Sequence, residues 1–311
     1  MSRVAAGIAW ALAFVVLEAI QFVFFGAVFQ RVNSFLFGAL VFTCVVLAFT
    51  GWAAVFRRDQ LRLAFANPRH LIAVNLTATF AWIAFLGSVE RIEPAIAYTI
   101  GAGVMPLTAW VAWRLGTPEG EPMRNWVEAS GNLLILLGIV GLGAITVSGY
   151  SGFTLGGPRG GTIGVALAIA DGILFTWLLI YSQRMDRQGI GPGTVFGLRF
   201  MLYVPVAASA AVIWPGAKAD LPPWEMAMIV GVGLLLIVPP LYALQRAVPL
   251  VSTLTISALT ALGPFVIFLL QLVEGRVDYS VLTLCGLAIY FVGAMIAALG
   301  AVRGAASGQR A

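Results

Sequence analysis

Two acidic residues interrupt long apolar stretches of the sequence, where a charged side chain needs a reason to be present. Glu18 lies near the middle of the first apolar stretch, and Asp171 lies in the sixth. An ionised carboxylate at the centre of a membrane-spanning helix costs at least ~2.5 kcal/mol. Such a pair could exchange protons for a substrate as a cavity opens to each side of a membrane in turn. The alternatives are a protonated Glu18 hydrogen-bonded across a helix interface, and an Asp171 that serves packing beside Gly172.

One arginine and several aromatic residues in apolar segments could also contact a ligand. Arg199 in the seventh segment could pair with one of the acids, bind a substrate carboxylate, or extend toward the headgroups at the membrane surface. Trp82, Tyr98 and Trp177 could form a stacking pocket, although belts and packing in membrane proteins also use aromatic residues. Thr255 belongs to a polar stripe in the ninth segment, which serves either a ligand or hydrogen bonds between helices.

The elements that must hold these residues are membrane helices. The chain is 60% hydrophobic and only 10% charged, whereas soluble domains carry about a quarter charged residues. Crossing a hydrocarbon core takes about 20 helical residues, and continuously apolar stretches of that length exclude a barrel of alternating strands. We therefore expect an all-α integral membrane protein with ten spans. The predicted spans are residues 5–29, 34–56, 70–89, 95–115, 127–148, 162–182, 193–214, 225–244, 250–273 and 280–302.

Basic residues are distributed unequally between the two sides of these spans. One side carries Arg3, Arg57, Arg58, Arg62, Arg69, Arg114, Arg124, Arg184, Arg187, Arg246, Arg303 and Arg310, and the other Arg31, Arg91, Arg159, Lys218 and Arg276. An excess of basic residues marks cytoplasmic connections, so both termini are expected in the cytoplasm. The same scatter argues against nucleic acid as a partner despite the net charge of +5, because a nucleic-acid binder concentrates its basic residues on one face.

Weak internal repetition divides the chain into two halves. EAIQF at residues 18–22 aligns with DGILF at residues 171–175, at an offset of 153 residues. At an offset of 155, two glycines of the fifth segment match two of the tenth: Gly131 with Gly286, and Gly138 with Gly293. Five is an odd number of spans, so the second half must enter the membrane in the opposite sense. We expect two inverted five-helix repeats, residues 1–150 and 151–311, in one membrane domain.

Two proline-containing segments carry a resemblance to a known family. PAIAYTIGAGVMPLTAWVAW in the fourth segment and PLVSTLTISALTALGPFVIFLLQ in the ninth are each followed by an acidic, glycine-bearing turn. With FGLRF at residues 196–200, they resemble the EamA-type branch of the drug/metabolite transporter (DMT) superfamily over nearly the whole chain. The resemblance implies ten helices with both ends cytoplasmic and a cavity lined by helices one, three, four, six, eight and nine. It also implies a carrier of amino acids, metabolites or drugs, most often an exporter.

The function expected from these observations is secondary transport of a small molecule across a bacterial inner membrane. The sequence has no GxxxxGK[ST] nucleotide loop, so an ion gradient must supply the energy. A single histidine, His70, and the absence of CxxC and HExxH motifs argue against an integral membrane enzyme and against a bound metal or cofactor. Cys44 and Cys285 are expected to be core residues.

The mechanism expected is alternating access with protons as the coupling ion, in a monomer or homodimer. A facilitative importer or exchanger is the alternative, because direction is not written in the sequence.

Overall fold

Long apolar runs that end at proline, glycine or arginine form the helices of this chain. The computed structural model describes residues 3–214, 221–247, 250 and 259–308. The helices of this part are α1 (Arg3–Arg31), α2 (Ser34–Phe56), α3 (Arg58–Ala66), α4 (Pro68–Arg91), α5 (Pro94–Arg114), α6 (Trp126–Val147), α7 (Gly157–Arg187), α8 (Pro192–Leu198), α9 (Tyr203–Ile213), α10 (Pro223–Ala247), α12 (Gly263–Glu274) and α13 (Val281–Gly308). The described residues contain no β-strand; Ile92 and Thr154 form one isolated bridge.

Nine helical segments of the described part are long and apolar enough to cross a membrane, which indicates a multi-pass membrane protein. They coincide with nine of the ten predicted spans. The remaining predicted span, residues 250–273, is represented by α12, which has only 12 described residues. Residues 251–258 of that span lie outside the described residues.

The seventh span is interrupted, which its continuous hydrophobicity does not reveal. α8 ends at Leu198, and α9 begins only at Tyr203. Asn75 of α4 bridges the gap, because its Nδ2 donates to the Leu198 carbonyl oxygen (3.0 Å) and its Oδ1 accepts from the Leu202 N–H (2.9 Å). Backbone polar groups at membrane depth require partners inside the protein. The buried Asn75 amide therefore replaces helical hydrogen bonds that the interruption removes.

Two other details differ from the sequence-based expectation. The connection between the second and third spans contains the nine-residue helix α3. Cys44 and Cys285, expected in the core, are exposed free thiols. Hydrophobicity does not show whether a cysteine faces lipid or the protein interior, because the outward face of a membrane helix is as apolar as its inward face.

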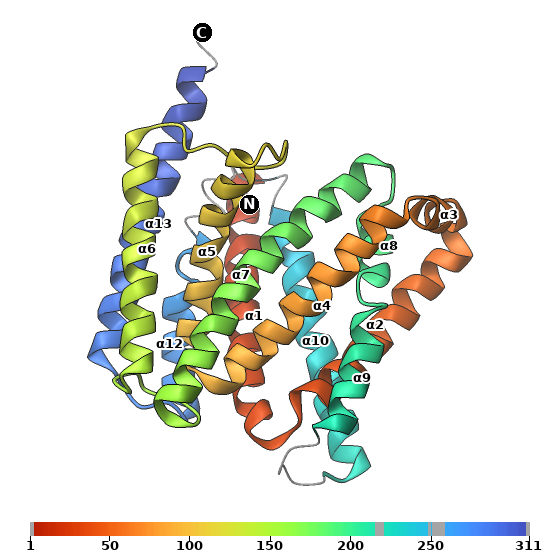
Figure 1. The fold of residues 1–311 in the computed structure, drawn as a ribbon, viewed down its shortest axis with the longest axis horizontal. Helices are drawn as coiled ribbons and strands as arrows, with labels where there is room; N and C mark the ends of the chain where they lie inside the picture. Colours follow the sequence, from red (N-terminus) through yellow and green to blue (C-terminus); the bar gives the residue numbers. More distant parts are fainter. Residues whose placement is uncertain (1–2, 215–220, 248–249, 251–258, 309–311) are drawn as a thin grey trace.

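Glycines allow α6 and α13 to pack closely along one edge of the bundle (Figure 1). A Cβ atom added to any of four glycines would press against the facing helix. The pairs run antiparallel: Gly131 against Ala297, Gly138 against Tyr290, Gly293 against Ile135, and Gly286 against Leu142. Close van der Waals contact of this kind drives helix association where both lipid and helix surfaces are apolar.

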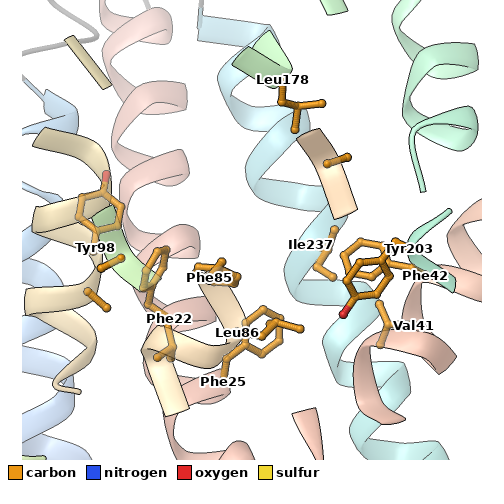
Figure 2. Close-up of a cluster of buried hydrophobic side chains, with 14 of the residues drawn as sticks. Phe22, Phe25, Val41, Phe42, Phe85, Leu86, Tyr98, Leu178, Tyr203 and Ile237 are labelled. Carbon is orange, nitrogen blue, oxygen red and sulfur yellow. The ribbon is translucent and has the colours of Figure 1, made fainter. Parts of the chain in front are cut away.

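The remaining helices pack in pairs drawn from distant parts of the chain. α4 lies along α7, α1 packs against α10, and α2 packs against both α8 and α9. In Figure 1 the first turns of α1 and the last turns of α13 lie toward the same, upper side of the bundle. Buried aromatic side chains fill the interior, and Figure 2 shows several of them between α1, α4 and α5.

The glycine contacts predict a position-specific effect on stability. Gly131→Ala would push a Cβ atom into the backbone of α13, so we expect the free energy of unfolding to fall by ~1–3 kcal/mol. Gly141→Ala, also in α6 but with open space around the added atom, should be neutral or slightly stabilising. Thermal unfolding in detergent, followed by tryptophan fluorescence, measures both. Equal melting temperatures for the two variants would contradict the packing described.

Candidate functional site

Glu18 meets α5 at a tyrosine. The Tyr98 hydroxyl donates a hydrogen bond to Glu18 Oε2 (3.1 Å), and Glu18 itself is half-buried on α1. Phe22, one helical turn after Glu18, packs edge-on against the Tyr98 ring with a centroid distance of 4.9 Å (Figure 2). A Cβ atom on Gly263 would lie 3.0 Å from the Tyr98 hydroxyl oxygen, so the first residue of α12 adjoins this pair. α1, α5 and α12 therefore meet at the Glu18 carboxylate.

Asp171, which aligns with Glu18 when the two halves of the sequence are compared, also lies against α5. Its Oδ2 lies 3.2 Å from the position that a Cβ atom on Gly101 would take, and the neighbouring Gly172 packs against the Gly101 carbonyl. Asp171 makes no hydrogen bond or ion pair within the described part of the chain. The absence of a side chain at Gly101 leaves room for the Asp171 carboxylate between α5 and α7.

The two carboxylates therefore adjoin the same stretch of α5. Tyr98, which contacts Glu18, and Gly101, which contacts Asp171, are three residues apart, so they are neighbours on the helix surface. Neither acid forms an ion pair with a described basic residue. Two acids that are 153 positions apart in the chain, one on α1 and one on α7, therefore each adjoin α5, at positions three residues apart.

A row of aromatic rings leads from Tyr98 to a second group of predicted site residues. The neighbouring centroids are separated by 4.9 Å (Tyr98 to Phe22), 4.9 Å (Phe22 to Phe85), 5.2 Å (Phe85 to Trp82) and 6.0 Å (Trp82 to Phe200). Figure 2 shows the Tyr98, Phe22 and Phe85 part of this row. The Trp82 Nε1 atom is buried and donates no hydrogen bond to any described residue.

Arg199 lies at the far end of the row, at the interruption between α8 and α9. Its guanidinium carbon lies 4.4 Å from the centroid of Phe196 and 4.8 Å from that of Phe200. Its Nε atom is buried without a hydrogen-bond partner in the described part of the chain. Arg199 forms no ion pair with an acid among the described residues. Its guanidinium group instead stacks on the two phenylalanine rings, which stabilises the positive charge.

Of the other two predicted site residues, one lies within the described residues, and it makes no ring contact with this row. Trp177 on α7 is half-buried and packs on Tyr181 with a centroid distance of 5.9 Å. Thr255 lies outside the described residues. No group of three or more His, Cys, Asp and Glu side chains in the described part is arranged to hold a metal ion.

Glu93 is a buried acid that the sequence analysis did not single out. It caps α5 just before Pro94, is 0% exposed, and accepts hydrogen bonds from the Gly152 N–H (3.1 Å), the Thr283 hydroxyl (3.2 Å) and the Gln271 side-chain amide. Burial raises the pKa of Glu93 to about 7, while these hydrogen bonds and the charge of Arg276 oppose the shift. The available signal was the Glu-Pro pair at a helix start.

Glu93 ties together four elements at one end of the bundle. Its partners belong to the α6–α7 connection, α12 and α13, and Glu93 itself precedes α5. At the same end, Arg31 and Glu225 form an ion pair of 2.7 Å between α1 and α10. Polar contacts therefore link these helices at this end.

Ion pairs also link helices at the opposite end of the bundle. Glu119, in the α5–α6 connection, pairs with Arg184 (2.8 Å) and Arg187 (3.0 Å) of α7. The hydrogen bond from Arg184 holds the pKa of the Glu119 carboxyl below its usual range. Polar contacts thus link separate helices at both ends of the bundle.

Comparison with known proteins gives a fold and no family. No protein-family model and no curated protein matches the sequence. A solved structure titled "Crystal structure of protein" is similar to the chain, with a TM-score of 0.62 and 19% sequence identity over 96% of this chain and 98% of that one. At this identity, the likeness shows that the two chains share a fold over almost their whole lengths.

The environment of Glu93 predicts a pH-dependent stability. The folded protein holds the Glu93 proton up to a pKa of about 7, whereas the ordinary value is 4.5, so stability should fall by up to ~3 kcal/mol as pH rises through this window. Glu93→Gln should make this slope shallower in thermal unfolding measured between pH 5 and 8. Glu121→Gln, at an exposed position, should leave the slope as in the wild type. An unchanged slope in Glu93→Gln would contradict the assignment.

Proposed function

We propose that this chain is a secondary active transporter of a small metabolite, amino acid or drug-like molecule, and that it works as an exporter by alternating access. The observation that carries this proposal is the placement of Glu18 and Asp171 against neighbouring positions of α5, without a basic partner among the described residues. A membrane protein retains such acids where they serve an ion or substrate pathway. Glu18, with a single hydroxyl partner, can release a proton to one side and regain it from the other.

The aromatic row supports a binding region for an organic molecule. Tyr98 and Phe22 offer ring faces and edges next to the Glu18 carboxylate, and further along the row Trp82 Nε1 is a buried donor that a bound ligand would satisfy. Arg199 lies where the seventh span is interrupted. Discontinuous membrane helices commonly form the substrate and ion sites of transporters. Trp177 and Thr255 remain proposed members of the cavity.

The packing of α6 against α13 supports two inverted repeats. When 155 is added to the residue number on α6 and subtracted from the residue number on α13, one contact between these two helices is converted into another. The contact of Gly131 with Ala297 corresponds to that of Gly286 with Leu142, and the contact of Gly138 with Tyr290 to that of Gly293 with Ile135. The packing of α1 on α10 corresponds in the same way to that of α7 on α4. Such exchange is what a two-fold relation between residues 1–150 and 151–311 would produce.

Membership of the EamA-type branch of the DMT superfamily completes the proposal. Ten helices would result if α12 belongs to a longer span that includes residues 250–273. An even number of spans agrees with the start of α1 and the end of α13 lying on one side (Figure 1). The excess of basic residues on that side favours the cytoplasm for both termini, in a bacterial inner membrane.

The polar contacts at the two ends suit an alternating mechanism. The Arg31–Glu225 pair and the Glu93 cluster link helices at one end, and the Glu119 pairs link helices at the other. Opening to either side requires only that one set of contacts separates while the other holds. The Arg31–Glu225 pair, whose arginine is exposed, can exchange for water at small cost, whereas the buried Glu93 and Glu119 carboxylates need other polar partners when their contacts separate.

Flux into proteoliposomes tests the proposed function. Purified protein would be screened with amino acids, metabolites and organic cations, with and without an imposed pH gradient. We expect one class of compound to accumulate when the gradient is present. Equal movement with and without a gradient would indicate a facilitative carrier or exchanger, and no movement across the panel would contradict transport.

Substitution of Glu18 tests the coupling. Glu18→Gln keeps the size and polarity of the side chain but cannot exchange a proton, so we expect a folded protein whose uptake falls to the level measured without a gradient. Asp186→Asn, which removes an exposed acid from the end of α7, should retain gradient-driven uptake. Gradient-driven uptake by Glu18→Gln at the wild-type rate would remove Glu18 from the coupling mechanism.

A further inference from the structure

The short helix α3 places positive charge at the ends of two membrane spans. It connects α2 to α4 and lies at the edge of the bundle, where Figure 1 shows it end-on. Four arginines on and beside it are exposed, and none forms an ion pair within the described part of the chain. They are Arg57, Arg58, Arg62 and Arg69. One acidic residue, Asp59, accompanies them, so the net charge of this surface is strongly positive.

The charges are concentrated on the outward face of α3. Arg58, Arg62 and Phe65 follow at spacings of four and three residues, which puts them on one stripe of the helix. The opposite face is fixed to the bundle, because Gln60 Oε1 accepts hydrogen bonds from the Thr194 hydroxyl (2.7 Å) and the Gly191 N–H (3.2 Å). The orientation of α3 is thereby set, with the arginine stripe pointing away from the protein.

Exposed aromatic residues border the arginines. Trp52 and Phe56 in the last turns of α2 are 44% and 67% exposed, and Phe65 of α3 is 55% exposed. A surface that binds a small soluble anion has no use for this apolar area in water, and two of these rings, Trp52 and Phe56, lie at the end of a helix long and apolar enough to span a membrane. Aromatic rings beside basic residues suit the boundary between headgroups and acyl chains, where the rings contact lipid and the guanidinium groups contact phosphate.

We propose that the α3 surface, formed by Arg57, Arg58, Arg62, Arg69 and the neighbouring Trp52, Phe56 and Phe65, binds the headgroups of anionic phospholipids. Guanidinium groups donate paired hydrogen bonds to phosphate oxygens, and Arg58 and Arg62 are close enough on the helix to share one headgroup. The Arg58 Nε atom is already engaged by the Ala54 carbonyl at 2.7 Å, which leaves its terminal nitrogens for the lipid. The inference requires that the chain spans a membrane and does not depend on the transport activity.

Native mass spectrometry of the detergent-solubilised protein tests this proposal. Phosphatidylglycerol and phosphatidylcholine would be titrated separately, and the retained lipid counted. We expect the wild type to retain phosphatidylglycerol in preference to phosphatidylcholine. The R58Q/R62Q variant should lose on the order of tenfold in phosphatidylglycerol affinity, because two charges near the headgroup are removed. R58K/R62K, which keeps both charges, should retain most of it.

A matched control separates local binding from general charge. R124Q/R159Q removes two exposed arginines, one just before α6 and one in the first turn of α7, and should bind phosphatidylglycerol like the wild type. Melting temperatures in neutral detergent check that all variants fold. If R58Q/R62Q does not fold, the R57Q/R69Q variant tests the same surface. Equal retention of both lipids by the wild type, or undiminished binding by folded R58Q/R62Q and R57Q/R69Q variants, would overturn the proposal. Displacement of the lipid by millimolar inorganic phosphate would also overturn it, because the ligand would then be the free anion.

Discussion

The hydrocarbon interior of a membrane supplies no water, so the polar groups of this chain must find their partners inside the protein. Asn75 shows the constraint most directly, because one side-chain amide satisfies both the carbonyl and the N–H exposed by the interruption at Arg199. Close helix packing follows from the same environment. The glycines of α6 and α13 supply van der Waals contact where no hydrophobic driving force acts between helices. The free-energy cost of unpaired polar groups and the close approach of helix backbones together determine the arrangement of the bundle.

Several polar groups in this chain lack a partner among the described residues despite this constraint. Glu18 has a single hydroxyl partner, and Asp171 has none in the described part of the chain. Trp82 Nε1 and Arg199 Nε are likewise buried without partners there. Of these groups, Glu18, Trp82 and Arg199 lie along or beside one row of aromatic rings, and other buried polar atoms without a described hydrogen-bond partner, such as Asn132 Oδ1 and the guanidinium nitrogens of Arg276, lie elsewhere. In the proposed binding region a ligand or proton would complete the polar contacts of Glu18, Trp82 and Arg199, whereas the Glu93 carboxylate is hydrogen-bonded to three other segments at one end of the bundle.

The sequence predicted most of the fold because span length and hydrophobicity are dictated by membrane thickness. Nine predicted spans coincide with helices, and two of the candidate site residues, Glu18 and Tyr98, share a hydrogen bond. The interruption of the seventh span was missed because a tertiary partner, Asn75, stabilises it. The exposure of Cys44 and Cys285 was missed because lipid and protein interior favour the same residues. Glu93 was overlooked because its partners come from three other segments, and no local spacing brings them together.

Proton release on substrate binding tests the central claim, that Glu18 exchanges a proton for substrate, most directly. The compound identified by transport would be added to purified protein in weakly buffered detergent solution, and a pH-sensitive dye would count the protons released. Wild-type protein is predicted to release a proton as it binds substrate, and Glu18→Gln is predicted to bind without release. Substrate binding by the wild type with no change in pH, or equal release by both proteins, would contradict the claim.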